Sequence, residues 1–149
     1  MAHLKLKEIV WELCGKCKNG CKFCGSKSVW NENIDEEKII SIAKKISEYP
    51  PEEINISGGD PLLVSTKTHE DITSILKKKK VICKIVISPK SLKEDNSEIL
   101  SILKNYDHIG ISINEKKDMD LAKKINHLKN ITYITNFNLE NIFLSRKYT

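Results

Sequence analysis

Four cysteines near the start of the chain are the residues best suited to chemistry. Cys14, Cys17, Cys21 and Cys24 follow the spacing C-x2-C-x3-C-x2-C. Thiolate sulfur favours zinc and iron–sulfur clusters. All four could close a structural zinc site, because such sites often use C-x2-C pairs, or a closed iron–sulfur cluster that only transfers electrons. Only three residues separate the two pairs, so a tight tetrahedron of four thiolates would be strained.

A second interpretation uses only Cys17, Cys21 and Cys24 as metal ligands. Three thiolates on a four-iron cluster leave one iron without a protein ligand, and an open position distinguishes a catalytic metal site from a structural one. Between the first two of these cysteines lies Asn19-Gly20, a dipeptide that readily takes positive φ and lets the chain wrap a cluster. Cys14 would then be a buried or neighbouring thiol, and Cys83 a core residue.

The elements that must position these cysteines alternate along the chain. Apolar runs rich in β-branched residues predict five strands, and amphipathic patterns predict a helix between each pair. Asp35 is the expected N-cap of the first helix. The predicted strands cover 7–13, 53–58, 83–88, 108–113 and 131–137, and the predicted helices cover 34–49, 69–79, 91–106 and 116–128.

This alternation predicts an α/β fold with a parallel sheet, in which ligands bind at the carboxyl ends of the strands. The chemically suggestive residues fall at those ends. The cysteines follow the first strand, and the segment Ser57-Gly58-Gly59-Asp60-Pro61 ends the second. Polar residues end the other three strands, namely Ser88, Ser112, Asn114 and Asn136.

Length and composition predict one soluble domain over residues 1–149. Hydrophobic residues make up 40% of the chain and charged residues 30%, as in ordinary globular proteins. No apolar run approaches the ~18 residues of a membrane span, and no signal peptide is recognisable, so we expect a cytoplasmic protein with reduced thiols. The net charge of +5 is nearly all lysine, with aromatic residues at only 6%, so no nucleic-acid partner is expected.

Two motifs together resemble the radical S-adenosylmethionine (SAM) superfamily. The first is C-x3-C-x2-C, Cys17 to Cys24, with the aromatic Phe23 before its last cysteine. The second is ISGGDPL (56–62), which is similar to the Gly-Gly-Glu/Asp-Pro segment that ends the second strand in this family. Both occur in the family's order, and the resemblance spans roughly residues 7–140.

The resemblance implies what these residues do. Cys17, Cys21 and Cys24 would hold a [4Fe–4S] cluster whose open iron binds SAM. One electron would cleave SAM to methionine and a 5′-deoxyadenosyl radical, which takes hydrogen from a substrate. Gly58 and Gly59 would let backbone approach the methionine end of SAM, and Asp60 or nearby backbone carbonyls would accept from its ammonium group. Contacts to the rest of SAM would come from Phe23, Ser57, Pro61, Ser88, Ser112, Asn114 and Asn136.

The resemblance also implies a partial (β/α) barrel of six strands, of which five are clear here. NIFLS (141–145) is the candidate for a short sixth strand. We expect a one-electron donor such as a flavodoxin or ferredoxin, and a protein substrate or partner over the open side of the barrel. Two alternatives stay open: a glycyl-radical activating enzyme of the anaerobic ribonucleotide reductase type, and a non-catalytic iron–sulfur or zinc-binding module. No motif names the substrate.

Overall fold

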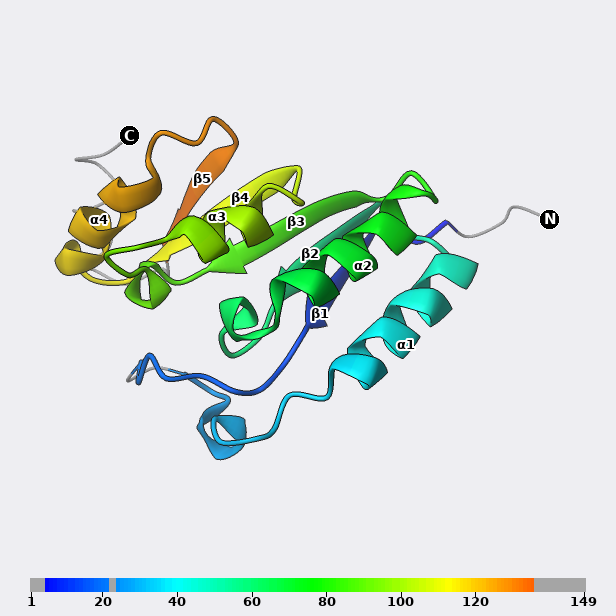
Figure 1. Ribbon diagram of the computed structural model, residues 1–149, viewed down its shortest axis with the longest axis horizontal. Helices are drawn as coiled ribbons and strands as arrows, with labels where there is room; N and C mark the ends of the chain where they lie inside the picture. The colour runs from blue at the N-terminus through cyan, green and yellow to red at the C-terminus, as the bar shows by residue number, and fades with distance from the viewer. Residues whose placement is uncertain (1–4, 22–23, 136–149) are drawn as a thin grey trace.

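Five parallel strands form one open sheet in the order of the sequence (Figure 1). This computed structural model describes residues 5–21 and 24–135. The strands are β1 (Glu8–Glu12), β2 (Glu53–Ser57), β3 (Ile82–Ile87), β4 (His108–Ile113) and β5 (Ile131–Thr135), each parallel to its neighbour. The predicted α/β fold is confirmed, and the open sheet is consistent with a partial barrel. Residues 136–137 of the predicted fifth strand and the candidate sixth strand, 141–145, lie outside the described residues.

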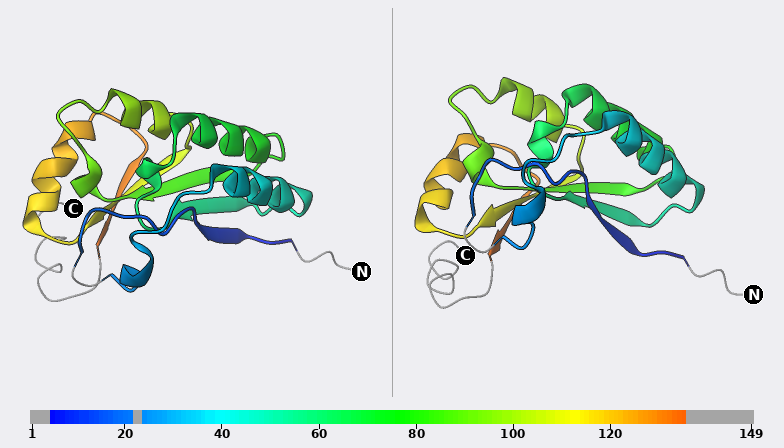
Figure 2. Two further views of the ribbon diagram at one scale, coloured as in Figure 1. Left: turned by 60° about the horizontal axis from the view of Figure 1, so that its bottom comes forward. Right: turned by 90° about the horizontal axis from the view of Figure 1, so that it is seen from below.

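A helix connects each strand to the next. These are α1 (Glu36–Glu48), α2 (Thr66–Lys77), α3 (Ser97–Leu103) and α4 (Lys116–Ala122), with short 3₁₀ turns at Lys27–Val29, Pro61–Leu63, Pro89–Ser91 and Lys123–Ile125. Right-handed crossovers between consecutive parallel strands bring the helices to the same face of the sheet. Figure 2 shows α1, α2 and α3 over that face. No helix in residues 5–21 and 24–135 has the length and apolarity to cross a membrane.

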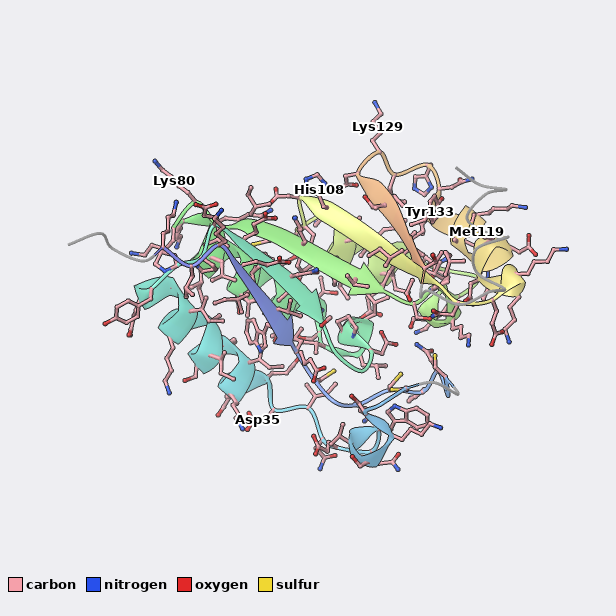
Figure 3. All side chains as sticks on the ribbon, turned by 180° about the vertical axis from the view of Figure 1, so that it is seen from behind. Asp35, Lys80, His108, Met119, Lys129 and Tyr133 are labelled. Atoms are coloured by element: carbon pink, nitrogen blue, oxygen red, sulfur yellow. The ribbon has the colours of Figure 1, made fainter. Side chains whose placement is uncertain are left out.

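The core lies between the sheet and these helices and consists largely of isoleucine. Ile54, Ile85 and Ile111 on the strands are completely buried, as is Ile72 on α2. Side chains alternate across a strand, so the residues between these isoleucines point to the opposite face. Figure 3 shows that face, with His108 labelled at its edge. That face includes the 64% exposed Val10. One face of the sheet is therefore the core, and the other is available to ligands.

The helix boundaries depend on polar caps. Asp35 caps α1 as predicted, because its carboxylate accepts from the Lys38 N–H at 3.0 Å. The second helix begins at Thr66, three residues before the predicted start at His69, because Ser65 accepts from the Thr68 N–H at 3.3 Å. The 69–79 pattern identified the buried face of α2 but missed the cap that starts the helix.

The predicted helix over 91–106 was too long. Pro89–Ser91 forms a 3₁₀ turn instead, and α3 begins only at Ser97. The Asn96 side chain accepts from the Lys93 N–H at 2.7 Å and donates to the Lys93 carbonyl at 2.8 Å. Such local side-chain bonds give the backbone an alternative to the helix. The predicted helix over 116–128 was also too long: α4 ends at Ala122 and continues only as a 3₁₀ turn to Ile125.

A buried histidine joins α2 to the loop after β2. His69 is completely buried, and its Nε2 lies 2.8 Å from the Pro61 carbonyl oxygen. A carbonyl only accepts, so Nε2 carries a hydrogen. Burial lowers the pKa of His69 below its ordinary value and so favours the neutral ring. In that form Nδ1, which lies 2.6 Å from the Tyr106 hydroxyl, accepts from it.

This histidine should make folding stability depend on pH. The stability from neutral His69 is complete above the ordinary histidine pKa of 6.5 and declines as the pH falls below it, since the unfolded chain takes up a proton that the folded chain resists. Urea unfolding of the cofactor-free protein between pH 7 and pH 5 should show this decline. His69→Gln should flatten it, and His108→Gln, at an exposed site, should leave it unchanged. A His69→Gln profile as steep as the wild type would contradict the assignment.

Candidate metal centre at the carboxyl edge of the sheet

A cavity of about 220 Å³ lies where the carboxyl ends of β2, β3 and β4 meet the loop that follows β1. Figure 3 shows sulfur atoms, drawn in yellow, on this loop. The loop contributes Cys17, Asn19, Cys21, Cys24, Ser26 and Trp30, and the strand ends contribute Ser57, Gly58, Gly59, Val86, Ile87, Ser88, Ser112 and Asn114. The structure thus brings three of the cysteines and most of the predicted strand-end residues to one site.

The cysteine loop curls back on itself through short-range contacts. Gly20 has a φ of +64°, so the expected positive-φ turn between Cys17 and Cys21 is confirmed there. Backbone N–H groups donate to two of the sulfurs, from Asn19 to Cys17 Sγ at 3.5 Å and from Ser26 to Cys24 Sγ at 3.4 Å. N–H donors of this kind stabilise the thiolate form. Burial nevertheless raises the pKa of the Cys17 thiol above its ordinary value.

Cys14 is separate from the other three cysteines. It lines a different cavity, of about 370 Å³, beside β1 and α1. Its thiol donates to the Asp60 carbonyl at 3.4 Å, and burial raises its pKa above the ordinary value. Across residues 5–21 and 24–135 no three His, Cys, Asp or Glu side chains are placed to share a single metal ion. Cys14 thus lines a different cavity from the other three cysteines, and the assignment of Cys17, Cys21 and Cys24 as metal ligands stays a prediction.

The Gly58-Gly59 pair packs directly against the cysteine loop. The Gly59 N–H donates to the Cys14 carbonyl at 2.8 Å, and the Asp60 N–H donates to the Lys16 carbonyl at 2.8 Å. A Cβ at Gly59 would lie 2.4 Å from the carbonyl oxygens of both Gly15 and Lys16, and one at Gly58 would lie 2.6 Å from that of Cys14. The sequence suggested that these glycines make room for a ligand. In the structure they make room for the neighbouring loop, and their backbone also lines the cavity.

Asp60 and Pro61 do not line this cavity. Asp60 is 5% exposed, and its carboxylate accepts from the Leu62 N–H at 3.1 Å and from the Ser91 hydroxyl at 2.8 Å. Burial raises the pKa of this carboxyl above its ordinary value, although the Ser91 bond opposes the shift. A contact between Asp60 and the ammonium of SAM stays a prediction, and the observed role of the side chain is to hold the turn.

The turn after β3 completes the site and was not predicted from the sequence. Asn19 on the cysteine loop donates to the Ser91 hydroxyl at 2.9 Å, and Ser91 in turn donates to Asp60. Lys90 Nζ lies 3.9 Å from Cys21 Sγ. Ser88 accepts from the Lys90 N–H at 3.3 Å, so it caps this turn as well as lining the cavity. The sequence pattern placed Ser91 in a helix, and no local pattern showed what this turn would contact.

The remaining polar groups decide whether a ligand fits. Trp30 lines the cavity, and its buried indole N–H has no hydrogen-bond partner among the described residues. The Asn114 amide donates to the Ser112 hydroxyl at 3.1 Å. Three soft sulfur ligands, an unused donor and several hydroxyls in one cavity suit an iron–sulfur cluster with a polar ligand beside it. The other two predicted residues, Phe23 and Asn136, lie outside the described residues.

A family model described as the Radical SAM superfamily matches residues 11–138. The chain therefore belongs to the radical SAM superfamily. Its members are generally enzymes that bind a [4Fe–4S] cluster and SAM, which agrees with the cysteine spacing and the cavity.

Comparison with other proteins adds little. No curated protein matches the chain. Among solved structures, one titled "Structure of CpGH84B" matches with a TM-score of 0.43 and 12% sequence identity, over 88% of this chain and 27% of that one. The chain thus corresponds to about a quarter of that protein, and a similarity of this size carries no functional argument.

Substituting Gly59 should test the packing of the two loops. In Gly59→Ala the new Cβ meets two backbone carbonyls that cannot move as a side chain would. We expect the free energy of unfolding of the cofactor-free protein to fall by about 1–3 kcal/mol. The measurement is urea denaturation followed by circular dichroism. Gly25→Ala is the matched control, because a Cβ there meets no atom of the described residues within 4 Å. Equal stability of the two variants would rule out this packing.

Removing the Ser91 hydroxyl should test the link from Asn19 to Asp60. Ser91→Ala leaves the Asp60 carboxylate buried with one partner fewer, so the free energy of unfolding at pH 7 should fall by about 1–3 kcal/mol. The control is Ser101→Ala, which removes a hydroxyl bond on an exposed helix surface and should change stability by less than about 0.5 kcal/mol. A Ser91→Ala loss no larger than that of the control would mean that the link is not formed in solution.

Proposed function

We propose that this protein is a radical SAM enzyme that binds a [4Fe–4S] cluster through Cys17, Cys21 and Cys24 and binds SAM in the same cavity. One observation carries the proposal. These three cysteines share a cavity of about 220 Å³ with the backbone of Gly58 and Gly59, and Cys14 lines a different one. When bound, the cluster would pass one electron to SAM and so generate the radical that takes hydrogen from a substrate.

The residues of the chain would bind and orient the two cofactors. The three thiolates hold the cluster, and the N–H groups of Asn19 and Ser26 keep two of the sulfurs in place. The Trp30 indole N–H, which has no partner within 5–21 and 24–135, can donate to SAM. Ser57, Ser88, Ser112 and Asn114 contribute polar atoms from three strand ends. Since they lie on a rigid sheet, these groups are placed before the ligand arrives.

The open face of the sheet is where the substrate and any partner protein would reach the site. This face carries another cavity, of about 380 Å³, which is lined in part by Asn55, Lys84 and His108. Val86 lines both this cavity and the one beside the cysteines. A substrate held there would therefore adjoin the bound SAM, and a partner could cover the exposed Val10 and Ile134.

A one-electron donor of the flavodoxin or ferredoxin type would supply the electron. The mildly basic surface, with a net charge of +5, would attract such an acidic donor. Cluster ligands must stay reduced thiols, so the proposed function goes with a cytoplasmic location.

Cysteine variants should test the ligand assignment. Anaerobic reconstitution should give brown wild-type protein with about four irons per chain. Cys17→Ala, Cys21→Ala and Cys24→Ala should each lose most of the iron and the visible absorption, whereas Cys14→Ala should keep both. Iron is measured by a colorimetric assay and the cluster by its absorption spectrum. Loss of the cluster in Cys14→Ala would overturn the three-cysteine assignment.

The catalytic claim has its own measurement. Dithionite and SAM added to the reconstituted protein should release 5′-deoxyadenosine and methionine in equal amounts, detected by chromatography, and none should form with Cys21→Ala. Brown protein that releases no 5′-deoxyadenosine would indicate a non-catalytic iron–sulfur module. Colourless protein with one tightly held zinc would indicate a structural site.

A further inference from the structure

The ammonium group of Lys90 lies next to one of the three cysteines. Its Nζ is 3.9 Å from Cys21 Sγ and 3.7 Å from the Glu115 carboxylate. The Lys90 side chain is only 15% exposed, so water screens its charge much less than at a surface lysine. Among the lysines that form the described salt bridges, Lys90 has the least exposed side chain.

The backbone around Lys90 holds this charge in place. Ser88 caps the turn through the Lys90 N–H at 3.3 Å, and the Ser91 hydroxyl is bound by both Asn19 and Asp60. Glu115, the N-cap residue of α4, also attracts the ammonium, at 3.7 Å. The side chain of Lys90 is thus fixed at both ends, by its own turn and by the two groups near its nitrogen.

We infer that Lys90 raises the reduction potential of the cluster bound at Cys17, Cys21 and Cys24, an inference that rests on the proposed function. In the reduction step one electron passes from an external one-electron donor to the cluster. No covalent bond forms or breaks in that step, and the negative charge at the site grows by one unit. A fixed cation beside a ligand sulfur stabilises the more negative form, so the cluster accepts the electron at a less negative potential.

The experiment is a potentiometric titration of the reconstituted full-length chain, followed by the electron paramagnetic resonance signal of the reduced cluster. Lys90→Met should shift the midpoint potential to a more negative value, and Lys90→Arg, which keeps the charge, should stay near the wild type. Lys117→Met is the matched control. Lys117 pairs with the same Glu115 at 2.9 Å, but its side chain is 65% exposed, so the control should shift the potential less.

Iron content and unfolding midpoints measured on the same samples separate the outcomes. Equal potentials for the wild type and Lys90→Met, both with full iron, would overturn the inference and leave the proposed function intact. A Lys117→Met shift as large as that of Lys90→Met would also overturn it, because the shielded position of Lys90 would then not matter. A wild-type chain that binds no cluster would instead overturn the proposed function.

A second neutral variant guards against loss of the cluster. If Lys90→Met cannot be reconstituted, Lys90→Gln provides the neutral side chain for the titration, and its potential should again be more negative than that of the wild type. Loss of iron in both neutral variants, with full iron in Lys90→Arg, would mean that the charge is needed to assemble the cluster and would overturn a role in setting its potential.

Discussion

The site depends on backbone hydrogen bonds that continue past the ends of β1 and β2. The Leu13 N–H donates to the Ser57 carbonyl at 3.0 Å, and beyond the strands the Gly59 and Asp60 N–H groups donate to the carbonyls of Cys14 and Lys16. The cysteine loop is therefore held to the second motif by the same interaction that holds the sheet. Such close backbone contact leaves no room for a Cβ at Gly58 or Gly59, so two loops distant in sequence are fixed in one position.

A rigid sheet makes this attachment useful. The strands bury isoleucines against the helices on one face, and β-branched side chains pack well on a pleated surface. Because that face holds the sheet together, residues on the opposite face and at the carboxyl edge are free to bind ligands. His69 extends the same support to the loop after β2, since it ties α2 to the Pro61 carbonyl.

Most of the fold could be predicted from the sequence because the pattern of strands and helices is encoded locally. The period of apolar residues predicted all five strands, and the cysteine spacing predicted a site that the structure brings into one cavity. The contacts between loops could not be predicted, because Asn19 and Ser91 are 72 residues apart and meet only in the folded chain. The helix over 91–106 was mispredicted for the opposite reason: a local bond of Asn96 outweighed a helical pattern.

The charges around the cavity follow from the same geometry. An anion near the cysteines opposes the formation of thiolates and of any more negative state, and Asp60 is such an anion for Cys17, although burial has the larger effect on its pKa. The Asp60 carboxylate is bound by Ser91 and Leu62, and Lys90 places a cation 3.9 Å from Cys21 Sγ. Ser91 and Lys90 both belong to the turn after β3. That turn therefore contacts the cysteine loop twice, through Ser91 at Asn19 and through Lys90 at Cys21, and joins it to the second motif through Asp60.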